Sequence, residues 1–115
     1  MKQNEIWLIN LDPTIGAEIK KARPAIIVND NLLGKLLFKI IVPLTDWKDR
    51  YEIAPWMIKI EPNSKNGLKM ISAADCFQVS SLSQKRFVKK LETVSGIIMN
   101  EIRIGLSKVL SLETE

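Results

Sequence analysis

Short apolar runs separated by turn residues dominate the first 80 residues, a pattern typical of β-strands. Asp12-Pro13 ends the first run, and residues 12–22 are expected to form a loop. Pro24 fixes its own φ and favours an extended backbone at Arg23, just before the second run. The strands predicted from these runs cover residues 5–11, 25–28, 36–44, 56–60, 68–72 and 76–79.

Helical spacing replaces this pattern after Ser95, which is a good N-cap residue. Apolar residues then recur every three or four positions, predicting one amphipathic helix of about four turns. Ile104 interrupts its polar face, as either a lone surface residue or part of a dimer contact. Short strands followed by one helix indicate a mainly β fold, a small and strongly curved antiparallel barrel with a C-terminal α-helix.

Composition narrows the class of protein. A chain of 115 residues, 46% hydrophobic and 26% charged, is expected to form a single domain over residues 1–115. No apolar run is long enough to cross a bilayer, and the N-terminus lacks an apolar signal core, so a cytoplasmic location is expected. The chain has no histidine, and Cys76 is its one cysteine, which argues against a zinc site and an intramolecular disulfide. We therefore expect no metal and no cofactor.

The net charge of +4 favours polyanionic partners, although charge alone is weak support for nucleic-acid binding. The positive charges are clustered rather than spread evenly. The clusters are Lys20, Lys21 and Arg23; Lys48 and Arg50; and Lys85, Arg86, Lys89 and Lys90.

Several motifs, in the same order along nearly the whole chain, resemble the MazF/PemK toxins of bacterial type II toxin-antitoxin systems. They are Ile-Trp-Leu-Ile-Asn-Leu-Asp-Pro-Thr-Ile-Gly-Ala-Glu from Ile6, Arg-Pro-Ala-Ile-Ile-Val from Arg23, Val-Pro-Leu-Thr from Val42, Asp75, and Met-Asn-Glu-Ile from Met99. The resemblance implies an SH3-like barrel of the CcdB/MazF/PemK type and a homodimer. It also implies a metal-independent endoribonuclease that cuts single-stranded RNA at short sequences. The implied partner is a MazE-like or PemI-like antitoxin whose acidic C-terminal segment occupies the RNA groove.

Metal-free RNA cleavage needs a base for the 2′-hydroxyl, stabilisation of charge on the phosphorus oxygens and a proton for the leaving 5′-oxygen. Arg23 matches the family's catalytic arginine, and its planar fork suits two phosphate oxygens; the alternative is a structural ion pair with Glu18 or Asp75. Glu18 matches the family's acid and is the candidate base, or the group that orients Arg23. Thr45 matches the family's hydroxyl residue, which donates to a phosphate oxygen, or else it starts a turn.

RNA binding requires phosphate contacts and stacking surfaces beside this site. Lys20 and Lys21 are the candidates for phosphate contacts, against a solvated charge pair. Trp47, just after Thr45, is the stacking candidate or a simple packing residue, whereas the other tryptophans are assigned to the core or an interface. Asp75 matches the family's acid, or it caps a loop, and Gln78 is a candidate hydrogen-bond donor to base or phosphate.

Three positions depart from the family pattern: Ala17, where many relatives carry His or Ser; Ala73, where some carry Arg; and Gln78, where relatives carry Arg or Lys. Two alternatives to a ribonuclease toxin therefore stay open. One is a relative with weak or no activity that binds RNA or antitoxin only. The other is a CcdB-like gyrase poison, which needs a helix face and no group of Arg23, Glu18 and Thr45.

Overall fold

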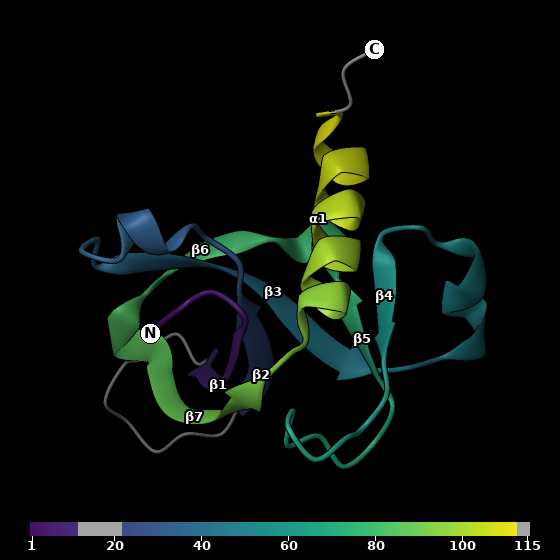
Figure 1. Cartoon of the computed structure of the whole chain (residues 1–115), viewed down its shortest axis with the longest axis horizontal. Helices are drawn as coiled ribbons and strands as arrows, with labels where there is room; N and C mark the ends of the chain where they lie inside the picture. Colours follow the sequence, from purple (N-terminus) through teal and green to yellow (C-terminus); the bar gives the residue numbers. More distant parts are fainter. Residues whose placement is uncertain (12–21, 113–115) are drawn as a thin grey trace.

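A computed structural model of the chain describes residues 1–11 and 22–112. Seven antiparallel strands form one strongly curved sheet in the order β4-β5-β3-β2-β1-β7, with β6 also paired to β3, and one helix covers it (Figure 1). The mainly β fold with a C-terminal helix is thus confirmed. The strands are β1 Glu5–Asn10, β2 Ala22–Ile27, β3 Phe38–Asp46, β4 Met57–Ile60, β5 Ser72–Asp75, β6 Ser80–Ser83 and β7 Phe87–Thr93, and the helix is α1 Gly96–Leu110.

Strand β3 is the longest strand and pairs with three others. Its first half pairs with β6, from Phe38 opposite Ser83, and its second half pairs with β5, from Leu44 opposite Ala74. Between β5 and β6 the chain leaves this edge of β3 in a single 3₁₀ turn, η3 (Cys76–Gln78). The other 3₁₀ turns are η1 Asn31–Leu33, η2 Asp49–Ile53 and η4 Gln84–Arg86.

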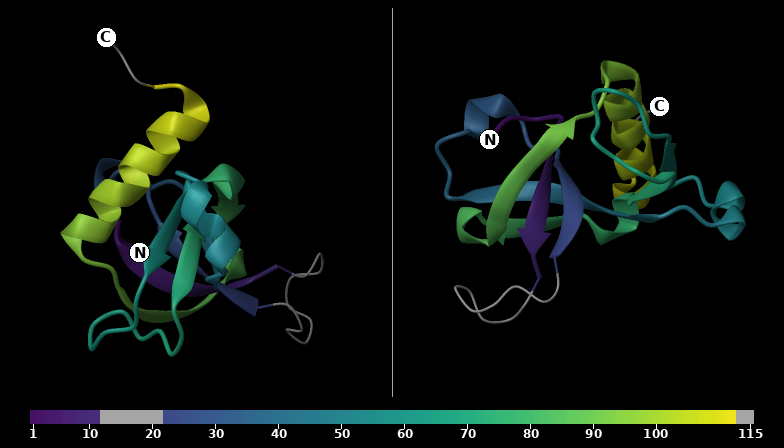
Figure 2. Two further views of the ribbon diagram at one scale, coloured as in Figure 1. Left: turned by 90° about the vertical axis from the view of Figure 1, so that its right-hand side faces the viewer. Right: turned by 90° about the horizontal axis from the view of Figure 1, so that it is seen from below.

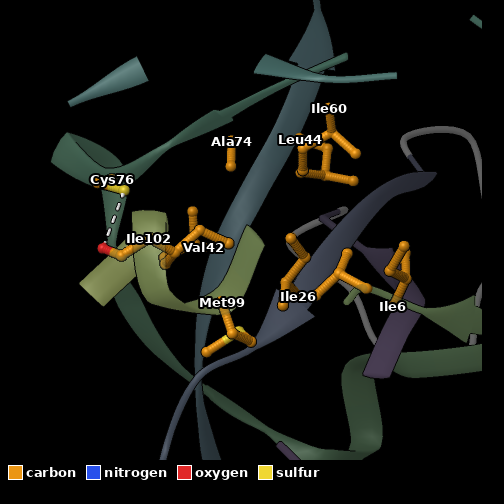
Figure 3. Packing of buried hydrophobic residues seen from close by; sticks show 10 residues of the cluster. Ile6, Ile26, Val42, Leu44, Ile60, Ala74, Cys76, Met99 and Ile102 are labelled. Atoms are coloured by element: carbon orange, nitrogen blue, oxygen red, sulfur yellow. Dashed lines mark hydrogen bonds between the residues drawn. The ribbon is translucent and has the colours of Figure 1, made fainter. Parts of the chain in front are cut away.

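Alternation along the central strands sends side chains to two separate cores. In β2, Ile26 enters the larger core, while Ile27 and Ala25 enter the smaller one. The larger core fills the space between the sheet and α1 (Figure 3). Its members are Ile6, Ile26, Val42, Leu44, Ile60, Ala74, Cys76, Val94, Met99 and Ile102; the smaller core holds Ile9, Ala25, Ile27 and Ile41.

Helix α1 begins where the sequence predicts, because the Ser95 hydroxyl accepts a hydrogen bond from the Ile98 amide at 3.2 Å. It packs on β4 and η3 and rises beside them in Figure 2. Gly105 lies at the closest approach, since a Cβ there would lie 2.8 Å from the Cys76 Sγ. Cys76 also donates a weak hydrogen bond to the Ile102 carbonyl, at 3.7 Å (Figure 3).

The strands predicted at 68–72 and 76–79 are wrong: β5 covers Ser72–Asp75 and overlaps the first prediction only at Ser72, and Cys76–Gln78 forms η3. The cause is a side-chain cap, because the Asp75 carboxylate accepts a hydrogen bond from the Phe77 amide at 3.1 Å and favours a turn. Asn66, which is buried, similarly holds the preceding loop by donating to the Glu61 carbonyl at 2.8 Å.

Other boundaries move by one to three residues. Strand β2 begins at Ala22, inside the predicted loop, because Ala22 and Arg23 pair with Asn10 and Ile9 of β1. Strand β3 starts and ends two residues later than predicted, which places Thr45 inside the sheet. The hydrophobic pattern did not predict β6 and β7, because the Ser and Lys residues of these strands leave no apolar run. Within the described ranges, no helix has the length and hydrophobicity needed to cross a membrane.

Candidate active site

Arg23 and Thr45 lie on the neighbouring strands β2 and β3. The recorded pairing of these strands ends at Ala25 opposite Pro43, and Arg23 and Thr45 each lie two residues beyond it. Both side chains line a hollow of about 650 Å³, together with residues at the ends of β1, β2, β3 and β5. The sheet therefore fixes the spacing of two of the three predicted catalytic residues.

A second hollow, of about 360 Å³, adjoins the first, and Arg23 and Thr45 line both. Asp75, at the end of β5, and Gln78 of η3 contribute to its wall, and Tyr51 contributes from η2. Four of the predicted site residues, far apart in the sequence, thus lie around one continuous depression. The pairing of β3 with β5 brings them together. In this pairing Thr45 lies opposite Ala73, which is two residues before Asp75.

Asp75 and Gln78 are hydrogen-bonded to each other. The Gln78 Nε2 donates to Asp75 Oδ2 at 2.9 Å, while Asp75 Oδ1 accepts from the Phe77 amide. The capping alternative for Asp75 is therefore what the structure shows, and the same carboxylate orients the Gln78 amide beside the hollow. Gln78 therefore places a neutral amide, rather than a cationic group, at this part of the second hollow.

The guanidinium of Arg23 is exposed to solvent. Among the residues that the structure describes, no carboxylate lies within ion-pair distance of it: the recorded pairs join Glu5 to Lys90 and to the N-terminal amine. The predicted alternative of a structural pair with Asp75 is thus absent. A free guanidinium beside a hydroxyl in an open hollow is suited to bind the oxygens of a phosphate.

Glu18, Lys20 and Lys21 lie outside the described residues. Leu11 and Ala22, which flank the connection that carries them, both line the larger hollow. Near the same point, Arg86 Nη1 donates to the Asn10 carbonyl at 3.2 Å. Both described ends of this connection therefore lie at the larger hollow, and the roles of Glu18, Lys20 and Lys21 stay predictions.

Trp47 follows β3 but lines neither hollow. Its ring packs edge-to-face on Tyr51, with centroids 5.7 Å apart, and the Lys59 ammonium lies 5.2 Å from its centroid. Tyr51, which sequence reasoning missed, is the aromatic residue that reaches the site. The interleaving of Trp47, Lys48, Arg50 and Tyr51 was the available signal, because alternating basic and aromatic residues are typical of RNA-binding surfaces.

Comparison with known proteins identifies the family and agrees with the fold. The profile of the family described as "PemK-like, MazF-like toxin of type II toxin-antitoxin system" matches residues 2–110. The chain is 31% identical over 113 residues to Endoribonuclease PemK of Escherichia coli, covering 96% of this chain and 83% of that protein. It is 24% identical to Endoribonuclease MazF9 of Mycobacterium tuberculosis, covering 97% and 98% of the two chains.

Among solved structures, an endoribonuclease in complex with its cognate antitoxin, from a mycobacterial species, superposes with a TM-score of 0.80. The match covers 100% of this chain and 99% of that one at 19% identity, and so it shows the fold. The chain belongs to the PemK-like, MazF-like toxins of type II toxin-antitoxin systems. The predicted family and the predicted fold class are both confirmed.

Proposed function

We propose that residues 1–115 form a single toxin domain that cleaves single-stranded RNA in the cytoplasm as a metal-independent endoribonuclease and so inhibits translation and growth. The observation that carries the proposal is the exposed Arg23, which has no ion-pair partner among the described residues and lines an open hollow together with Thr45. Family membership and the relatives named as endoribonucleases support it.

The reaction divides among a few groups. The 2′-hydroxyl attacks the adjacent phosphorus and gives up its proton, with Glu18 as the candidate base or as the group that orients Arg23. Arg23 stabilises the negative charge that builds up on the phosphorus oxygens, because a guanidinium is permanently positive and donates several hydrogen bonds. The same permanent charge makes it a poor proton shuttle. Thr45 donates a further hydrogen bond. The P–O5′ bond then breaks and the 5′-oxygen takes up a proton, leaving a 2′,3′-cyclic phosphate and a 5′-hydroxyl end.

Partners follow from the same family membership. A MazE-like or PemI-like antitoxin with an acidic segment is complementary to the positive charge at Arg23, Lys20 and Lys21, and would compete with RNA phosphates for them. The solved relative that carries its cognate antitoxin supports this assignment. A homodimer is also proposed, with Ile104 of α1, which is 49% exposed, as one candidate contact.

The test is cleavage of a mixed-sequence single-stranded RNA in the presence of EDTA. Cleavage that stops when a 2′-deoxynucleotide occupies the cut position supports the mechanism. Arg23→Ala should lower kcat/KM about 10²- to 10³-fold, the usual loss for one donor to a transition-state oxyanion. Its thermal unfolding should stay unchanged, because Arg23 is exposed and unpaired.

Arg103→Ala is the matched control, since Arg103 is an exposed arginine on α1 that contacts only Gln3, through Nη2 at 3.1 Å. Normal cleavage by Arg23→Ala would refute the assignment. Intact RNA that still binds the wild-type protein tightly would instead indicate the inactive relative. Inhibition of gyrase supercoiling without RNA cleavage would indicate the CcdB-like alternative.

A further inference from the structure

A separate groove with aromatic walls lies next to the catalytic hollows. It measures about 460 Å³ and is bounded by the residues that lead into β4, by η3 and by the last turn of α1. Phe77 is 70% exposed and Trp56 is 38% exposed. The lining residues are Pro55, Trp56, Asp75, Phe77, Lys108 and Val109.

The two rings sit on backbone that is held in place. The Trp56 carbonyl accepts a hydrogen bond from the Cys76 amide at 3.1 Å, and the Phe77 amide donates to Asp75. Their ring centroids are 6.5 Å apart, with planes tilted by 53°, so each ring keeps an open face. The Cys76 side chain, next to Phe77 in the sequence, is packed against Ile102 of α1 (Figure 3). The aromatic surface is thus built in advance and needs little ordering when a ligand binds.

The groove adjoins the catalytic site. Asp75 lines both this groove and the hollow that contains Arg23 and Thr45. Within η3, Phe77 lines the groove and Gln78 lines the hollow, so two consecutive residues belong to the two neighbouring spaces. The groove is therefore next to the position expected for the cleaved phosphate.

We propose that Phe77 and Trp56 form a stacking subsite for the nucleobase next to the cleaved phosphate. The proposal rests on the proposed ribonuclease function. Stacking on exposed aromatic rings is how single-stranded RNA is commonly held, and it tolerates any base. Lys108 at the rim supplies a positive charge for the adjoining phosphate.

Two observations favour a base over an apolar side chain of a protein partner. The groove combines aromatic faces with a donor, Lys108, and an acceptor, Asp75, and the edge of a base offers partners for both. Trp47, the stacking candidate from the sequence, has its ring occupied by Tyr51 and Lys59 and lines none of these spaces. The aromatic surface open to the ligand is therefore the one on Phe77 and Trp56.

The experiment uses the full chain and a short RNA centred on the cut position, which is located by sequencing the 5′-hydroxyl ends of cleaved RNA. Phe77→Ala should raise KM about 5- to 150-fold, the range for loss of one stacked base, with kcat nearly unchanged. The same RNA with abasic nucleotides on both sides of the cut bond should be cleaved equally by both proteins. Ile53→Ala is the control, because Ile53 is 90% exposed on the neighbouring η2 and lines none of these spaces.

Abasic substitution then identifies the contact. In the wild type, removing one particular base beside the cut should raise KM as much as Phe77→Ala does, and in Phe77→Ala the same removal should have no further effect. Phe77→Trp should retain the low KM, whereas Phe77→Leu, which keeps the apolar area but loses the ring, should not.

An unchanged KM in Phe77→Ala, full retention in Phe77→Leu, or a loss that no abasic position reproduces would each overturn the subsite. Full retention in Phe77→Leu would point to a subsite for an apolar peptide side chain. A loss that no abasic position reproduces would point to a contact with the RNA backbone. These failures are distinct from failure of the ribonuclease function, in which the wild type itself cleaves no RNA.

Discussion

Replacing Gly105 by alanine tests how tightly α1 is packed on the turn that carries Asp75 and Phe77. Gly105 is buried within α1, and an added Cβ would lie 2.8 Å from the Cys76 Sγ and 3.5 Å from Ile58 Cδ1. The first distance is well inside ordinary van der Waals contact, which begins near 3.5 Å. Cys76 is itself fully buried, so its sulfur has no open space into which to move.

Two opposing terms set the expected size. Alanine gains about 1 kcal/mol over glycine in a helix interior, through lower backbone entropy in the unfolded chain. Overpacking a close-packed core costs roughly 1–3 kcal/mol, and so short a contact belongs at the upper end of that range. The net expectation for Gly105→Ala is a loss of about 2 kcal/mol in the free energy of unfolding. For a domain of this size, that lowers Tm by roughly 8 °C.

Thermal unfolding at fixed protein concentration measures this loss, because any self-association would make Tm depend on concentration. Gly96→Ala is the control: a Cβ at Gly96 has nothing within 4 Å, so this variant should be neutral or slightly stabilised. Cys76→Ala in the Gly105→Ala background removes the clashing sulfur and should recover most of the loss, giving a coupling of about 1–2 kcal/mol. A Gly105→Ala protein as stable as Gly96→Ala, or strictly additive effects, would refute the packing argument.

Two further predictions use pKa shifts. Burial, helped by the charge of Asp75, raises the pKa of the Cys76 thiol to about 12, so at pH 8 iodoacetamide should label it only after unfolding in guanidinium; rapid labelling of the folded protein would contradict this. Burial alone would raise the pKa of Glu5. Hydrogen bonds from Trp7 and from the Lys2 amide, together with the hydrogen bond and charge of Lys90, have the larger effect and lower this pKa below its ordinary value of 4.5. The stabilisation by Glu5 is therefore present above pH 4.5 and lost as the pH falls through the lowered pKa. Glu5→Gln should reduce the change in the urea unfolding midpoint between pH 6 and pH 3. An unchanged pH dependence would exclude this role.

The sequence predicts those elements whose stability is local. Ser95 and the spacing of Ile98 and Ile102 specify α1 because a cap and a helical stripe act within a few residues. Pro24 likewise specifies the extended backbone at Arg23. Strands β6 and β7 escaped prediction because pairing with β3 and β1, rather than an apolar pattern of their own, holds them in the sheet.

The same distinction between local and long-range interactions applies to the candidate site. Motifs name Arg23 and Thr45, but the pairing of β2 with β3 brings both residues to one hollow, and register depends on contacts distant in sequence. Tyr51 and Phe77 were missed because each reaches a hollow through a short 3₁₀ turn. The turn at Phe77 exists because one carboxylate, Asp75, bonds to the backbone instead of continuing the strand.

The packing of Gly105 on Cys76 also sets when the molecule becomes complete during its own synthesis. Translation runs from β1 towards α1, so η3 and its aromatic groove have no helix to rest on until residues 96–110 have left the ribosome. Lys108 and Val109, which close the groove, are among the last of these to emerge. An enzyme that cuts messenger RNA endangers its own template, and this order of assembly delays completion of the proposed RNA-binding groove until α1 has been synthesised.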